Sequence, residues 1–187
     1  KEIVKSCTFG EMIAEDSPMF DIEYVFLQIR AKSVGEKAKL KVLCPDDGKT
    51  YANVEIDLAK IEVFVDDDHS PNIMIDEDRK LGVVMRYPAL KDVDADTLQG
   101  DINIQKTYKM ITNCIEQIYE DEEVYLRKDT SNKELQDFVD NLSADQMKKL
   151  SKFYNTMPRL EHIVKVKNPK TEVESEVTLK GLASFFG

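Results

Sequence analysis

Two stretches of alternating apolar and polar residues, separated by a short turn, constrain the fold of this chain more than any other feature. The stretches are residues 39–43 and 51–56, and the turn between them contains Asp47 and Gly48. Successive side chains on a β-strand point to opposite faces, so each stretch has one apolar face. The Asp-Gly pair suits the backbone angles of a tight turn. The sequence therefore predicts an antiparallel β-hairpin over residues 39–56.

Further strands are indicated by short stretches that are rich in β-branched residues and bounded by proline, glycine or aspartate. These stretches are residues 61–65, 73–75, 81–87, 163–166 and 173–179. Pro88 ends the third of them, because proline lacks the N–H that a sheet requires. The last two flank a turn at residues 168–170 and predict a second hairpin.

Helices are indicated where apolar residues recur every three or four positions. The predicted helices cover residues 21–34, 102–119, 131–140 and 143–157, followed by a short segment at 182–186. Ser131 and Ser143 are predicted N-caps, each with an acid or amide three residues later, as in a capping box. Asp21 is the predicted N-cap of the first helix and Gly35 its predicted end. These elements predict the α+β class, with a small antiparallel sheet of β-hairpins packed with about four to five α-helices.

The chain has 187 residues, which is long enough to bury a core. We expect one compact domain over residues 1–187, and a division into subdomains 1–100 and 101–187 stays open. The chain starts at Lys1 without an initiating methionine or an apolar leader, so we expect a trimmed start.

A hairpin-then-helix pattern occurs twice, in residues 41–58 and in residues 165–182. The first turn, Cys-Pro-Asp-Asp-Gly from Cys44, has the shape of a C-P-x-C-G zinc knuckle with Asp47 in place of the second cysteine. The second turn, Asn-Pro-Lys-Thr from Asn168, lacks both cysteines. Structural zinc needs four Cys or His ligands, and one thiolate does not hold it. We therefore predict zinc-knuckle-like turns without metal.

The formal net charge is −10, and acidic residues cluster at 62–78 and 120–123. Nucleic-acid affinity depends on Lys and Arg displacing counterions, so binding to DNA or RNA is disfavoured. We interpret the acidic runs as a solvated surface, with docking on a basic partner as the alternative. No apolar run reaches the roughly 18 residues of a membrane span, so we expect a soluble protein without membrane contact.

The residues with reactive side chains occur without the neighbours that catalysis requires. Cys7, Cys44 and Cys114 are an odd, widely spaced set, which predicts free structural thiols in a reducing cytoplasm. His69 lies in an acidic turn and His162 follows a proline-ended helix, and neither has a partner motif. We predict structural or surface roles for both histidines.

Metal and cofactor motifs are equally incomplete. Asp92, Asp94 and Asp96 resemble the opening of a calcium loop, but the glycine at its sixth position and the glutamate at its twelfth are missing. Phosphate-binding loops and hydrolase motifs do not occur. We predict no catalytic, cofactor-binding or metal-binding residues and no enzymatic activity. The alternatives are a metal-assisted hydrolase using the carboxylates of residues 66–68 with His69, and a zinc-ribbon-like adaptor for nucleic acid.

Three segments resemble the baseplate proteins of T-even-like bacteriophages, a family of hub subunits and hub-assembly factors. They are PMFDIEYVFLQIRAKSVGE at residues 18–36, GVVMRYP at 82–88 and FYNTMPRL at 153–160. Their order also matches, so the resemblance covers nearly the whole chain. Such relatives often carry two C-P-x-C knuckles and an upstream β-rich segment. Here three of the four knuckle cysteines are missing, which leaves the interaction role untouched.

The resemblance implies assembly of the central hub of a contractile tail in the host bacterial cytoplasm, and a place in the virion baseplate. The implied partners are other hub or tail proteins, and the chain is either a permanent subunit or a transient assembly chaperone. Homo-oligomerisation stays open. Such a role requires apolar anchors on a rigid scaffold. The candidate partner-binding residues are Tyr24, Leu27, Phe185 and Phe186, with packing into the protein's own core as the alternative.

Overall fold

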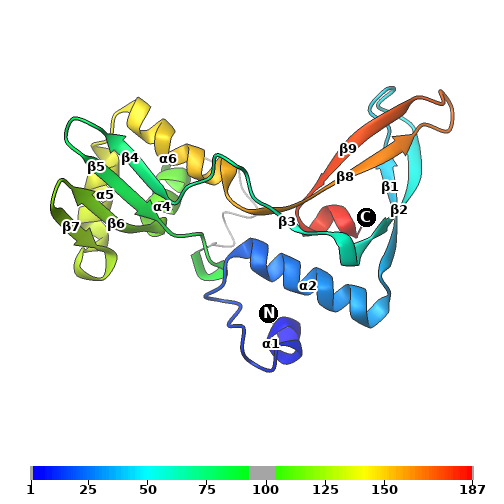
Figure 1. Cartoon of the computed structure of the whole chain (residues 1–187), viewed down its shortest axis with the longest axis horizontal. Coiled ribbons are helices and arrows are strands. Elements are labelled where there is room, and N and C mark those ends of the chain that lie inside the picture. The colour runs from blue at the N-terminus through cyan, green and yellow to red at the C-terminus, as the bar shows by residue number, and fades with distance from the viewer. Residues whose placement is uncertain (1, 93–103, 187) are drawn as a thin grey trace. The chain divides into compact units, whose positions relative to one another are not determined.

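The computed structural model describes residues 2–92 and 104–186, and its elements are shown in Figure 1. The chain divides into two compact units. The first unit is Lys1–Phe64 with Pro158–Gly187, and the second is Val65–Met157. The boundaries differ from a division near residue 100, because the last part of the chain contributes its hairpin to the first unit.

The first unit contains the N-terminal helices and both hairpins. Its elements are α1 (Glu2–Cys7), α2 (Met19–Val34), β1 (Lys37–Leu43), β2 (Tyr51–Asp57), the 3-10 turn η1 (Leu58–Lys60), β3 (Val63–Phe64), β8 (Arg159–Lys167), β9 (Glu174–Lys180) and the 3-10 turn η4 (Leu182–Phe185). β1 and β2 form a two-stranded sheet, and β3, β8 and β9 form a three-stranded one, all antiparallel. Each hairpin is followed by a short 3-10 turn, so the predicted repetition of a hairpin-then-helix pattern is confirmed.

One apolar cluster joins α2 to the two hairpins. Its buried members are Leu27, Ala31, Leu40, Val42, Cys44, Ala52, Ile56, Leu58, Ile61, Leu160, Val164, Val166, Leu179 and Phe185. The buried positions alternate along β1 and along β8, as the period of two requires. The apolar faces inferred from the alternation therefore point into a shared core.

The first long helix ends where predicted but begins earlier. Gly35 has a φ of 136°, which side chains rarely adopt, and its N–H donates to the Ala31 carbonyl at 3.2 Å. The predicted N-cap at Asp21 is wrong, because the helix starts at Met19 after Pro18. Asp21 lies in the first turn, where a negative charge favours the helix dipole. The helix α1 was not predicted.

The second unit is a four-stranded antiparallel sheet with helices packed on it. Its elements are β4 (Asn72–Asp76), β5 (Leu81–Met85), the 3-10 turn η2 (Leu90–Asp92), α4 (Ile104–Cys114), β6 (Ile115–Glu120), β7 (Glu123–Leu126), the 3-10 turn η3 (Arg127–Asp129), α5 (Asn132–Asp140) and α6 (Ala144–Thr156). The strand order is β4-β5-β6-β7. The core combines Ile75, Leu81, Val83, Met85, Ile111, Cys114, Ile115, Ile118, Leu135, Val139, Leu150 and Phe153. The α+β class is thus confirmed, although the strands described here form three sheets.

The local signals around α5 and α6 were reliable. Ser131 accepts a hydrogen bond from the Glu134 N–H and Ser143 accepts one from the Gln146 N–H, and each N3 side chain bonds back to its cap. Both predicted capping boxes are therefore confirmed. The structure also explains why residue 82 is glycine, because a Cβ there would lie 2.1 Å from two atoms of the Tyr119 side chain.

The predicted helix over residues 102–119 is wrong beyond Cys114. Ile115 begins β6, which pairs with β5 and β7, and Asp121 makes the β6–β7 turn with a φ of 51°. Ile115 and Ile118 are buried in β6, but a spacing of three also fits one face of a helix, so the spacing alone did not separate helix from strand. Of the three aspartates that resemble the opening of a calcium loop, Asp94 and Asp96 lie outside the described residues.

Candidate protein-interaction surfaces

The tips of the two hairpins in the first unit are joined by hydrogen bonds, and we call this contact the tip clamp. It consists of Asp46 in the first turn with Asn168 and Thr171 in the second. The Asn168 Nδ2 donates to both carboxylate oxygens of Asp46 at 3.0 Å, and the Thr171 hydroxyl donates to Oδ2 at 2.5 Å. Asn168 has no exposed surface. The two tips therefore hold each other through side chains that are 122 residues or more apart in the sequence.

Each turn of the tip clamp is also closed from within. Asp47 accepts hydrogen bonds from the backbone N–H groups of Lys49 and Thr50 at 3.0 and 2.9 Å, and from the Thr50 hydroxyl at 2.6 Å. These bonds, the Thr50 hydroxyl first, hold the pKa of Asp47 well below its usual range. Asn168 Oδ1 accepts from the Lys170 N–H at 2.8 Å. Side chains thus replace backbone partners in both turns, as in Asx-turns.

The four knuckle positions do not fit a structural zinc ion. Position 44 supplies a thiol, but Asp47, Asn168 and Thr171 supply a carboxylate, an amide and a hydroxyl, each already hydrogen-bonded within its turn or to the other turn. Burial raises the pKa of the Cys44 thiol, and the neighbouring carboxylates raise it further, which disfavours the thiolate that zinc requires. Within residues 2–92 and 104–186, no three His, Cys, Asp or Glu side chains are grouped to hold a metal ion. Side-chain hydrogen bonds hold the two turns together, as a zinc ion does in a zinc knuckle.

The predicted partner-binding residues lie in two different environments. Leu27 and Phe185 are fully buried in the first core, and Tyr24 is partly buried against it. Phe186 is 39% exposed, and its ring meets the Phe26 ring edge-on with centroids 6.2 Å apart. Core packing therefore accounts for Leu27 and Phe185, while partner binding by Tyr24 and Phe186 stays a prediction.

A more exposed apolar surface lies at the N-terminus, where the residue pattern predicts no helix or strand. It consists of Ile3, Phe9 and Ile13, and we call it the N-terminal apolar segment. Ile3 and Ile13 are more than half exposed, and Phe9 is 95% exposed. Val4 of α1 is buried, which attaches α1 to the unit. The segment lacks helical or strand periodicity, so only the presence of Phe9 beside Gly10 could have drawn attention to it.

Phe9 also has an unusual backbone conformation. Its φ is 53°, a left-handed value that commonly belongs to glycine after a helix. The Gly10 N–H donates to the Lys5 carbonyl at 2.8 Å and the Phe9 N–H to the Ser6 carbonyl at 3.4 Å, the pattern of a Schellman motif. A left-handed residue with a side chain costs roughly 1–2 kcal/mol. The chain therefore holds a large aromatic ring in water at a position where glycine would be more stable.

The histidines have structural surroundings. His69 Nδ1 lies 3.0 Å from the Thr156 hydroxyl and Nε2 lies 2.9 Å from the Tyr87 hydroxyl. Its ring stacks on Tyr87 and lies against Phe153. Burial lowers the pKa of His69, opposed in part by Asp66. Both ring nitrogens have hydroxyl partners, so neither is paired with the carboxylates of residues 66–68. His162 lies on β8 opposite Leu179.

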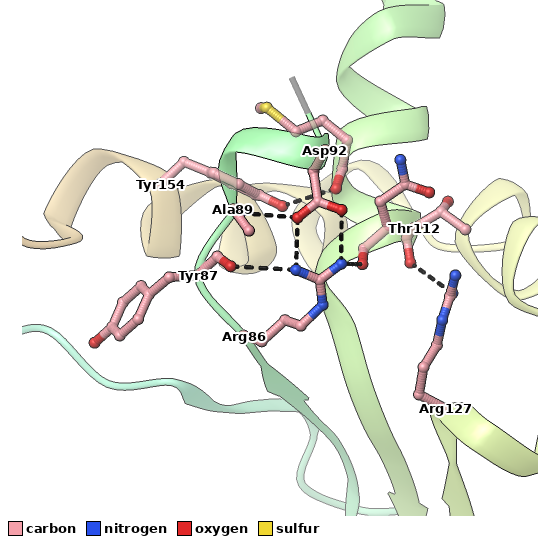
Figure 2. A network of polar contacts seen from close by, with 9 residues as sticks. Arg86, Tyr87, Ala89, Asp92, Thr112, Arg127 and Tyr154 are labelled. Carbon is pink, nitrogen blue, oxygen red and sulfur yellow. Dashed lines mark hydrogen bonds and ion pairs between the residues drawn. The ribbon is translucent and has the colours of Figure 1, made fainter. Parts of the chain in front are cut away.

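A polar network in the second unit ends α4, as Figure 2 shows. Arg86 donates to both oxygens of Asp92 at 2.6 and 2.9 Å and to the Asn113 carbonyl at 2.8 Å. Arg127 donates to the Thr112 carbonyl at 3.2 Å. The Tyr154 hydroxyl donates to the Met110 carbonyl at 3.2 Å. The carbonyls of Thr112 and Asn113 are among the last four of α4, which a helix end leaves without partners in the helix. The network therefore stabilises the end of α4 at Cys114, where the chain enters β6.

No helix within the described ranges is long and apolar enough to cross a membrane. A family model described as T4 bacteriophage base plate protein matches residues 1–187, which is the whole chain. No curated protein and no solved structure matches it.

Proposed function

Because this chain belongs to the T4 bacteriophage base plate protein family, we propose that it works in the tail hub by binding other baseplate proteins. The role is either that of a permanent hub subunit or that of a chaperone, which holds hub parts during assembly in the host cytoplasm and then leaves. The proposed partners are other hub or tail proteins. Self-association is left to measurement.

The N-terminal apolar segment carries this proposal. A phenylalanine buries roughly 150–250 Å² in an interface, and full burial of such a side chain contributes roughly 1.5–3 kcal/mol. Phe9 gains almost none of this burial free energy within its own unit, because its side chain is 95% exposed. Its left-handed backbone adds strain that glycine would relieve. An exposed aromatic ring kept at a strained position supports a role as an anchor for a partner.

We also propose that the role is not enzymatic. Both nitrogens of His69 already have hydrogen-bond partners, and the carboxylates nearest in sequence do not form a metal-binding group with it. This arrangement speaks against the metal-assisted hydrolase. The acidic net charge speaks against a nucleic-acid adaptor.

The test compares three forms of the tagged chain in phage-infected cells: wild type, Phe9→Gly and Glu172→Gly. Glu172 is a matched control, because it is also exposed and has a φ of 63°. Both substitutions relieve backbone strain, but only Phe9→Gly removes an aromatic ring. We expect wild type and Glu172→Gly to co-purify with other baseplate proteins, and Phe9→Gly to lose them. Failure of wild type to co-purify with any baseplate protein would refute the proposal.

Mass spectrometry of mature baseplates separates the two versions of the role. Fixed stoichiometry of this chain in mature particles supports the permanent subunit. Consistent absence from mature particles, together with co-purification from infected cells, supports the transient chaperone.

A further inference from the structure

The second unit has a groove of about 590 Å³ between the sheet and helix α5. Its apolar lining comes from both elements and from the segment that follows α5. The apolar residues are Leu81, Ile118, Tyr125, Phe138 and Leu142. Leu81 and Ile118 are buried members of the core, whereas Tyr125 is 47% exposed. The floor is therefore fixed, and one aromatic ring stands open to solvent beside it.

The rim of the groove is acidic. Its lining includes four carboxylates, from Glu120, Asp129, Glu134 and Asp137, and one guanidinium, from Arg79. Arg79 is already paired with Glu120 at 2.8 Å. Glu134 is already engaged by the Ser131 N–H and hydroxyl in the capping box.

Asp129 and Asp137 are the two acids of the rim that remain available. Both are exposed, and within the described part of the chain neither carboxylate has a hydrogen-bond or ion-pair partner. They flank an apolar floor, so a ligand that satisfies them and covers the floor must combine positive charge with apolar surface. A volume of about 590 Å³ is within the usual range of roughly 300–1,000 Å³ for binding pockets and leaves room for more than one side chain.

We infer that this groove receives a basic segment of a partner protein, whose apolar side chains cover the floor while its Lys or Arg side chains pair with Asp129 and Asp137. A second copy of this chain is a poor occupant, because its net charge of −10 brings like charges to an acidic rim. Acidic peptides and phosphate groups are repelled for the same reason. The inference rests on the proposed protein-interaction role and names the chemistry of one partner.

The test uses the purified full chain and a fluorescent peptide of leucine and lysine, with binding measured by fluorescence anisotropy. Two matched peptides replace the lysines by glutamate or the leucines by serine. We expect only the leucine and lysine peptide to bind, with an affinity that falls as salt is raised. Equal binding of the glutamate peptide or of the serine peptide would overturn the inference.

The location is tested by two double variants with the same change of charge. Asp129→Asn with Asp137→Asn removes the free acids of the rim, whereas Glu62→Gln with Asp67→Asn removes two exposed acids that do not line the groove. We expect the rim variant to weaken binding by about tenfold and the control variant to change it by less than about twofold. Equal losses in both variants would overturn the inference.

Sedimentation of the same samples tests whether a second copy of this chain occupies the groove. A dimer of the free chain that dissociates when leucine and lysine peptide is added would place a second copy in the groove and would overturn the inference. These measurements use no phage component, so their failure is distinguishable from a failure of baseplate co-purification.

Discussion

The tip clamp makes a quantitative prediction for Asn168→Ala. Asn168 is fully buried and its amide acts at both ends. Nδ2 donates to Asp46 and Oδ1 accepts from the Lys170 N–H. The forked contact with Asp46 and the bond from the Lys170 N–H are counted as two interactions of about 1 kcal/mol net each, so their loss should lower the free energy of unfolding by about 2 kcal/mol. The removed atoms also leave a small void, which adds to the loss.

The assay is urea unfolding of wild type, Asn168→Ala and the control Asn155→Ala, each with and without a metal chelator. Asn155 lies on an exposed part of α6, where alanine is well tolerated, so the control should stay within about 0.5 kcal/mol of wild type. Because hydrogen bonds join the tips, the chelator should change none of the three values. An Asn168→Ala loss below about 0.5 kcal/mol, or a wild type destabilised by the chelator, would refute this account of the tip clamp.

Asn168→Asp tests the same contact through pH. The new carboxylate would face the carboxylate of Asp46 in place of a donor, and like charges raise the pKa of both groups in the folded state. A raised folded pKa means that the destabilisation is full above that raised value, shrinks as the pH falls through it, and is gone below the unfolded value of about 3.9. Asn168→Asp should therefore approach wild-type stability in acid. A loss that does not depend on pH would contradict this reasoning.

Two further predictions concern the second unit. Arg86→Met should lower the free energy of unfolding by about 2–4 kcal/mol, because it leaves the largely buried Asp92 without its partner; a loss below about 1 kcal/mol in urea unfolding would argue against it. Burial lowers the pKa of His69, so its stabilisation is complete above the unfolded value of about 6.5 and declines as the pH falls below it. Thermal unfolding against pH should show this decline in wild type but not in His69→Gln, and its persistence in the variant would point to another group.

Local signals in the sequence were enough for elements whose stabilising contacts are also local. The hairpin around Asp47 and Gly48 and the capping boxes at Ser131 and Ser143 depend on residues within a few positions of one another. Alternation and cap chemistry therefore located them before any tertiary contact was known.

Elements that depend on distant partners were less predictable. The last turns of α4 accept hydrogen bonds from Arg86, Arg127 and Tyr154, which lie directly after β5, in η3 and in α6. The spacing of Ile115 and Ile118 gives no information about these donors, so the helix predicted from it extends past Cys114. The Asp46 to Asn168 contact is equally non-local, so the sequence predicted knuckle-shaped turns but not what joins them.

The candidate interaction residues show the same limit. Leu27 and Phe185 were chosen because they are apolar beyond the main stripe of a helix or near a chain end, and both are core residues. Phe9 was not chosen, although it is far more exposed. Exposure depends on what the rest of the unit covers, and composition does not report it.

Cross-linking mass spectrometry of baseplate assemblies from infected cells tests the central claim most directly. Lys5 lies on α1 beside Phe9, and Lys128 lies next to Asp129 at the groove of the second unit. The account predicts cross-links from these lysines to other baseplate proteins. Cross-links that join them only to lysines of this same chain would contradict it.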